Sequence, residues 1–175
     1  MPDMTGGEAL VQSLIRHGVK VIFGLPGVQI MDTMDALFKQ TDIRFITTRN
    51  EQATTYMADG YARASGNPGV ALVVPGPGIM NASAGLGTAF AASSPVLLIA
   101  GQINTEFIGK SRGVLHEVED QLSIVRSVTK WDANINDAQE IPNAIHEAFT
   151  HLQTGRPRPV AIEIQPETMA EIADI

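Results

Sequence analysis

The chain has 175 residues, a net charge of −7 and 44% hydrophobic residues, a composition typical of one folded domain of ordinary size. The acidic balance argues against a nucleic-acid-binding protein, which would carry a basic surface. No window approaches the roughly 18 apolar residues of a membrane span, and the N-terminus lacks a signal-peptide pattern. The absence of cysteine excludes disulfides and thiolate chemistry, and it fits a cytoplasmic setting.

Short apolar runs rich in β-branched residues recur along the chain and predict strands. They lie at 19–23, 43–47, 70–74, 96–100 and 160–164, with a weaker run at 127–131. Most of these runs are continuously apolar rather than alternating, as strands covered on both faces require.

Helices are expected between these strands. Thr5 and Glu8 have the spacing of a capping box and open a helix that ends near Gly18. Further helices are expected over about 30–39, 79–92 and 138–153. The clearest helix begins near Glu51 and carries apolar or small residues at helical spacing: Ala53, Tyr56, Met57, Gly60, Tyr61 and Ala64. Segment 79–92 is mostly Ala, Gly and Ser, which suits close packing either inside the domain or at a subunit interface.

Strands that alternate with helices predict right-handed crossovers and a parallel sheet. We therefore expect a three-layer, doubly wound, flavodoxin-like α/β domain, with a six-stranded parallel sheet and helices on both faces. Ligands of such folds bind outside the carboxyl ends of the strands. That rule selects segments 24–29, 49–52 and 75–81, and the loop that begins at Gly101, as candidate functional segments.

Two familiar kinds of site have little support in these segments. Gly76-Pro77-Gly78 begins like a dinucleotide-binding fingerprint, but Asn81 stands at the position of its third glycine. The four histidines include no pair with the spacing of a metal site, so we expect no metal ligand on this chain.

Glu51 follows a predicted strand and opens the clearest helix. An acid in the first turn of a helix is common, because it complements the helix dipole. However, Phe45, Ile46 and Met57 are close along the chain and indicate partial burial, where a carboxylate needs a specific partner. The residues alone leave both interpretations open.

Several short motifs follow one another along the chain, at 23–27, 49–53, 58–63, 69–70, 75–78 with Asn81, 101–102, 129–130 and 155–157. In order and spacing they resemble the N-terminal, pyrimidine-binding domain of thiamine-diphosphate enzymes of the acetolactate synthase-like group. The resemblance covers about residues 4–166, and residues 167–175 resemble the start of a linker to a middle domain. It implies one domain of a longer lyase or transferase, inactive when alone.

The resemblance also implies roles for individual residues. Glu51 matches a glutamate that hydrogen-bonds N1′ of the cofactor's aminopyrimidine and activates the cofactor for ylide formation. The cofactor-binding residues that it implies are Pro26, Gly27, Glu51, Pro75, Gly76, Pro77, Gly78 and Asn81, and the substrate-side candidates are Val28, Gln29, Gln102 and His116. Leu115-His116-Glu117 stands where acetolactate synthases have Phe-Gln-Glu, so both decarboxylation and carboligation of a 2-oxo acid stay open.

The implied cofactors are thiamine diphosphate and Mg²⁺. The metal ligands are expected on a different domain, because the Gly-Asp-Gly motif of that site does not occur here. FAD binding stays open. The implied partners are a 2-oxo acid substrate and a diphosphate-binding domain, of the same longer chain or of another subunit, in a homo-oligomeric dimer or tetramer. No nucleic-acid or membrane partner is expected.

Two alternatives belong to other functional classes. One is a non-catalytic binding or regulatory module that keeps the fold without the chemistry. The other is a nucleotide-binding domain of an oxidoreductase, which only the Gly76-Pro77-Gly78 turn suggests.

Overall fold

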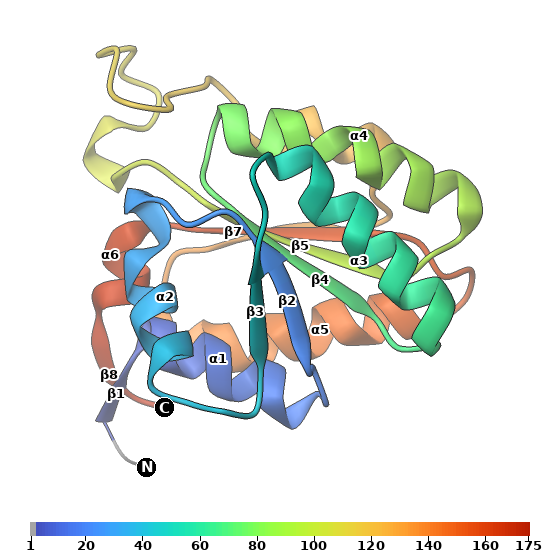
Figure 1. The fold of residues 1–175 in the computed structure, drawn as a ribbon. Helices are drawn as coiled ribbons and strands as arrows, with labels where there is room; N and C mark the ends of the chain where they lie inside the picture. The colour runs from blue at the N-terminus through green and yellow to red at the C-terminus, as the bar shows by residue number, and fades with distance from the viewer. Residues whose placement is uncertain (1–2) are drawn as a thin grey trace.

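A six-stranded parallel sheet forms the centre of the computed structural model, which describes residues 3–175 (Figure 1). The strand order is β3-β2-β4-β5-β7-β6, and every neighbouring pair is parallel. The strands are β2 (Val21–Gly24), β3 (Arg44–Thr47), β4 (Gly69–Val73), β5 (Val96–Gly101), β6 (Asp132–Ile135) and β7 (Val160–Ile164). The chain runs from β2 to one edge, returns to β4 and continues to the other edge. The predicted doubly wound, flavodoxin-like fold is therefore confirmed.

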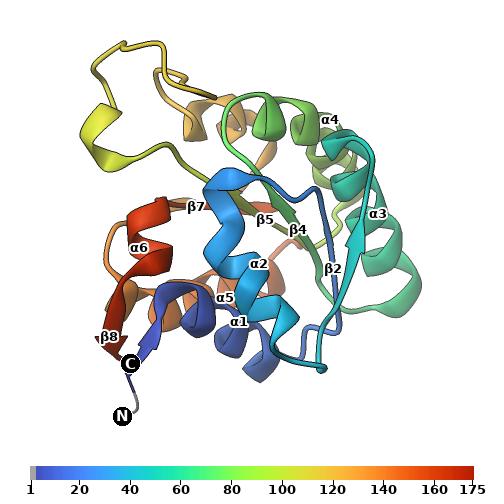
Figure 2. The ribbon, with the colours of Figure 1, turned by 60° about the vertical axis from the view of Figure 1, so that its left-hand side comes forward.

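Helices cover both faces of this sheet (Figure 2). One face carries α1 (Gly6–Arg16), α2 (Met31–Phe38) and α5 (Ile141–Gln153), and the other carries α3 (Glu51–Ser65) and α4 (Pro77–Ala92). Two buried apolar clusters fill the spaces between the layers, and β4 serves both of them. Val70 and Leu72 join the cluster under α1, α2 and α5, whereas Ala71 and Val73 join the cluster under α3 and α4. Alternate strand residues thus bury both faces of the sheet.

The two ends of the described chain form a small ribbon beside the main sheet. Strand β1 (Asp3–Thr5) pairs antiparallel with β8 (Ile172–Asp174), and the short helix α6 (Pro166–Ala170) precedes β8. The predicted capping box opens α1: Thr5 Oγ1 accepts from the Glu8 backbone N–H at 3.1 Å, and Glu8 Oε2 accepts from that of Thr5 at 3.0 Å. Residues 167–175 thus fold onto the domain, and their role as the start of a linker stays a prediction.

The weak strand predicted at 127–131 is wrong. Residues 126–128 form a short 3₁₀ turn, and the Thr129 hydroxyl donates to the Val125 carbonyl at 3.0 Å. The real strand, β6, follows at the edge of the sheet, where only Ile135 among its residues is buried. An edge strand that buries so little has no apolar run by which a sequence pattern finds it.

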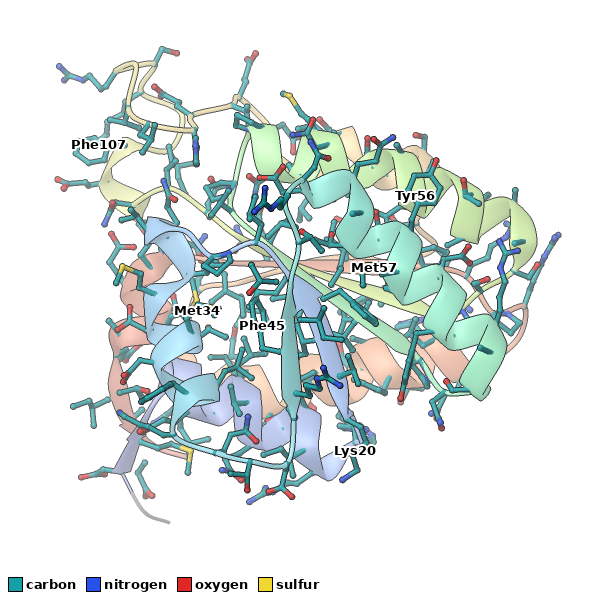
Figure 3. All side chains as sticks on the ribbon, in the orientation of Figure 1. Lys20, Met34, Phe45, Tyr56, Met57 and Phe107 are labelled. Atoms are coloured by element: carbon teal, nitrogen blue, oxygen red, sulfur yellow. The ribbon has the colours of Figure 1, made fainter. Side chains whose placement is uncertain are left out.

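Helix α3 is confirmed, but the predicted stripe of apolar and small residues is not its buried face. Tyr56 and Met57, which Figure 3 labels, are 42% and 39% exposed. The buried residues are instead Thr54, Thr55, Ala58, Asp59 and Ala62. These small side chains allow α3 to approach α4 closely: Thr55 Oγ1 donates to the Ala82 carbonyl at 2.6 Å.

The small residues of α4 serve this internal contact. A Cβ atom on Gly85 would lie 2.3 Å from Thr55 Oγ1 and 2.7 Å from the Tyr56 backbone nitrogen. Of the two uses that the sequence left open for segment 79–92, packing inside the domain is the one observed. No helix within residues 3–175 combines the length and the hydropathy needed to cross a membrane.

Candidate functional site

The candidate segments gather at one edge of the sheet. Segment 24–29 follows β2, 49–52 follows β3, 75–81 follows β4, and the long loop 102–121 follows β5. Because these strands are parallel, their carboxyl ends lie at the same edge, the upper one in Figure 1. The sheet thus brings together residues that lie far apart in the sequence.

Glu51 and Asn81 meet at this edge. Asn81 Nδ2 donates a hydrogen bond of 3.0 Å to Glu51 Oε2. The capping of α3 is done by a different residue, because Asn50 Oδ1 accepts from the Gln52 backbone N–H at 2.8 Å. The Glu51 carboxyl is therefore free of that task and extends toward α4. Within residues 3–175 no Lys or Arg forms an ion pair with it, so its bonded partner is a neutral amide.

The turn before α4 is buried and tightly held. Pro75, Gly76 and Gly78 are buried, whereas Pro77 is exposed. Gly76 has a φ of +56°, and a Cβ atom there would lie 2.5 Å from the His116 carbonyl oxygen. Glycine is therefore required both by the backbone conformation and by the contact. The loop after β5 packs on this turn, since His116 supplies the contacting carbonyl.

A buried network of two amides and a carboxyl lies beneath the turn. Gln121 Oε1 accepts from the Gly76 backbone N–H at 2.9 Å, and Gln121 Nε2 donates to Gly101 O at 2.8 Å and to Glu163 Oε2 at 3.1 Å. Gln102 Nε2 also donates to Glu163 Oε2, at 3.2 Å. All three side chains are almost completely buried. Gln102 thus bonds inside the protein, and its role toward substrate stays a prediction.

The pKa of Glu163 is displaced upward. Burial is the main reason that the pKa of the Glu163 carboxyl lies above its ordinary value, and the carboxylates of Asp120 and Asp132 add to the rise. The two amide donors act in the opposite direction. Burying the Glu163 carboxyl costs free energy, and the hydrogen bonds of the network offset that cost.

Val28 and Gln29 line a pocket of about 390 Å³ beside the loop after β5. Its other lining residues are Ile103, Asn104, Phe107, Val114, Leu115 and Pro166. Val28 is 70% exposed, whereas Gln29 is buried and its Nε2 donates to the Leu115 carbonyl at 3.5 Å. Gln29 Oε1 and His116 Nδ1 are both buried without a hydrogen-bond partner, which is uncommon for polar atoms.

The remaining predicted residues are backbone neighbours of these groups. Pro26 is exposed, and a Cβ atom on Gly27 would lie 2.3 Å from a methyl group of Val74. Segment 24–29 thus packs directly on the strand end that leads into the Gly76 turn. Within residues 3–175 no three His, Asp or Glu side chains gather as a metal-binding group.

Residues 4–124 match the family model described as "Thiamine pyrophosphate enzyme, N-terminal TPP binding domain". This chain belongs to that family. The resemblance found in its motifs is therefore confirmed, and the Glu51–Asn81 contact lies in a TPP-binding domain of the acetolactate synthase-like group.

Curated relatives of this TPP-binding domain are enzymes. A probable 2-ketoarginine decarboxylase of Pseudomonas aeruginosa is 39% identical over 95% of the chain. The acetolactate synthase large subunit of Haemophilus influenzae is 40% identical over 97% of the chain, and a probable one of Methanocaldococcus jannaschii is 41% identical over 98%. The chain spans only 28–30% of the length of these three relatives.

Sequence reasoning missed Gln121 and Glu163. Glu163 left one signal, because it is the only charged residue in the apolar run 160–164. A charge inside a strand that is covered on both faces needs a partner, so it marks a buried polar group. Gln121 left no signal, since nothing in a polar loop distinguishes a buried glutamine from an exposed one.

Proposed function

We propose that this domain forms the aminopyrimidine side of the active site in a thiamine-diphosphate-dependent 2-oxo acid decarboxylase or carboligase. The observation that carries the proposal is the contact between Glu51 and Asn81 at the carboxyl edge of the sheet. The names of the relatives, a decarboxylase and acetolactate synthases, support this reaction class.

Glu51 fits the partner that this role requires. Its carboxyl is partly buried and bonded to a neutral amide, so a nitrogen base that shares a proton with the carboxyl is a suitable further partner. Asn81 orients the carboxyl through Oε2, which leaves Oε1 to hold a proton toward N1′ of the aminopyrimidine. When bound, thiamine diphosphate supplies the electron sink for the carbanion that remains after a 2-oxo acid loses carbon dioxide.

The backbone around Glu51 would bind the flat ring. We assign to the cofactor the residues of the turn before α4 and of the segment after β2, which are Pro75, Gly76, Pro77 and Gly78 with Pro26 and Gly27. We assign Val28, Gln29, Gln102 and His116 to the substrate side. The 390 Å³ pocket beside Val28 and Gln29 is large enough for the side chain of a small 2-oxo acid.

The rest of the active site would come from a second domain. We propose that a diphosphate-binding domain, of the same longer protein or of a partner subunit, holds Mg²⁺ and the diphosphate. The exposed apolar face of α3 supports a subunit contact, because Ala53, Tyr56 and Met57 line an open groove of about 500 Å³. A bound FAD would lie mainly outside this domain. We expect residues 167–175 to lead toward a middle domain, and the enzyme to work in the cytoplasm as a dimer or tetramer.

The contact between Asn81 and Glu51 disfavours the nucleotide-binding alternative. This alternative rests on the Gly76-Pro77-Gly78 turn, and that turn is followed by Asn81, whose side chain bonds a carboxylate. A pyrophosphate needs N–H donors and a positive environment at this place, and a nearby carboxylate would repel it.

The test is Glu51→Gln in the complete protein, with Glu147→Gln on the exposed surface of α5 as the control. Glu51→Gln keeps the size of the side chain and removes its proton transfer, so turnover of a 2-oxo acid should fall by about 10²–10⁴. Thiamine diphosphate binding, measured by calorimetry with Mg²⁺, should persist. Near-normal turnover of Glu51→Gln with the cofactor bound would falsify the proposal.

A further inference from the structure

We propose that Gln121 and Glu163 are positioning residues that hold the Gly76 turn, and through α4 the Asn81 side chain, in place beside the cofactor. The inference rests on the proposed function, because only that proposal assigns the turn to the cofactor. Neither residue is expected to touch substrate or cofactor.

The surroundings of Gln121 determine which way its amide faces. Two acceptors, Gly101 O at 2.8 Å and Glu163 Oε2 at 3.1 Å, lie on one side and require the NH₂ group. The carbonyl oxygen must then face the other side, where the Gly76 N–H lies at 2.9 Å. Glu163 therefore sets the direction of the amide, and the amide supplies the acceptor that the buried Gly76 N–H needs.

The loop segment 116–121, which carries Gln121, also contacts the Gly76 turn from a second side. The His116 carbonyl oxygen packs against Gly76 so closely that no Cβ atom would fit. Glu117 stabilises that part of the loop, because its carboxylate accepts from the backbone N–H groups of Arg112, Gly113 and Val114. The segment 116–121 thus contacts the turn through one backbone carbonyl and one side-chain amide.

The position of Gly76 is transmitted directly to α4. Its carbonyl accepts from the Met80 N–H at 3.1 Å, which forms the first turn of the helix, and Asn81 follows Met80. No side chain caps this helix. A shift of Gly76 would therefore move the Asn81 amide relative to Glu51, and placement errors of about 1 Å in a catalytic group are costly.

The charges that act on Glu163 come from two neighbouring elements. Asp120, in the loop that carries Gln121, and Asp132, on β6, disfavour its ionised form. Arg126 pairs with both of them at 3.3 Å. On the β5 side, the neighbours of Glu163 are the Gly101 carbonyl and the Gln102 amide, which carry no charge. An added carboxylate at position 121 would therefore face Glu163 without a cation to offset it.

The experiment uses Gln121→Glu, the exchange variant Gln121→Glu/Glu163→Gln, and Gln153→Glu on the exposed end of α5 as a control. In the complete protein, thiamine diphosphate affinity is measured by calorimetry with Mg²⁺, turnover is measured at saturating cofactor, and thermal midpoints are compared. Gln121→Glu places two carboxyls together, so affinity or turnover should fall about tenfold at pH 8 and recover as the pH is lowered, because the pair then shares a proton.

The exchange variant again places one amide beside one carboxyl at positions 121 and 163, but the Gly101 carbonyl loses its donor. Both values should therefore recover at pH 8 by at least about threefold over those of Gln121→Glu, without reaching those of the wild type. Gln121→Glu with wild-type affinity and turnover at every pH would overturn the inference. So would an exchange variant that is folded and no better than the single one. If the wild-type protein itself fails to bind thiamine diphosphate, the proposed function fails instead.

Discussion

The side chains of Glu51 and Asn81 are joined at 3.0 Å although 30 residues separate them in the chain. Glu51 opens α3 and Asn81 lies near the start of α4, and these helices pack side by side on one face of the sheet. Their contact is possible because β3 and β4 deliver both helices at the same edge. The alignment of two helix starts is therefore what places an amide donor on the Glu51 carboxyl.

Removing the donor of this bond should impair turnover more than cofactor binding. Asn81→Leu keeps the approximate size of the side chain and leaves the Glu51 carboxyl without its orienting partner. A hydrogen bond that orients a catalytic carboxyl contributes enough that turnover in the complete protein should fall about tenfold. Asn143→Leu, on the exposed surface of α5, is the control. Unchanged turnover of Asn81→Leu would show that the bond has no part in catalysis.

Gly76→Ala should destabilise the protein. The new Cβ atom would lie 2.5 Å from the His116 carbonyl oxygen, at a φ of +56° that disfavours any other residue. The free energy of unfolding in urea should fall by roughly 2 kcal/mol or more. Gly60→Ala is the matched control, because Gly60 lies within α3 and a Cβ atom there meets nothing within 4 Å. That variant should be more stable by about 0.5–1 kcal/mol, since alanine favours a helix.

The exposed apolar face of α3 should govern assembly. Tyr56→Glu/Met57→Glu places charges on a surface that we assign to a subunit contact, and a charge is expensive to bury there. Sedimentation of the complete protein should show dimers that dissociate at concentrations at least about tenfold higher than for the wild type. Phe38→Glu, which changes a 90% exposed apolar residue on α2, should leave assembly unchanged. If both variants and the wild type dissociate at the same concentration, α3 is not part of the subunit interface.

His17 should make stability depend on pH. Its ring stacks on Phe149 at 4.4 Å; burial is the main cause that lowers the pKa of His17 below its ordinary value of 6.5, and the nearby His146 adds to this. The unfolded chain then binds a proton at a higher pH than the folded one. The contribution of neutral His17 to the free energy of unfolding is fully present above pH 6.5 and is lost as the pH falls through the lower pKa of the folded state. Urea midpoints from pH 8 to pH 5 should fall less steeply for His17→Gln; parallel profiles would contradict the assignment.

Much of this fold follows from local patterns. The apolar runs at 70–74, 96–100 and 160–164 become three of the four interior strands, because a strand buried on both faces must be apolar throughout. The capping box of Thr5 and Glu8 forms as its spacing predicts. The order of strands and helices also sufficed to predict the edge at which the candidate residues gather, since parallel strands end together.

Other features depended on contacts between distant segments. The edge strand β6 buries too little to show a pattern, and α3 turned out to bury threonines and alanines, because α4 lies close enough to require small side chains. The partners of Glu51 and Glu163 were equally hidden in the sequence. A carboxyl in the sequence indicates that a donor is needed but not where the donor lies. Only the packing of α3 on α4 brings Asn81 to Glu51, and only the packing of the loop after β5 on β7 brings Gln121 to Glu163.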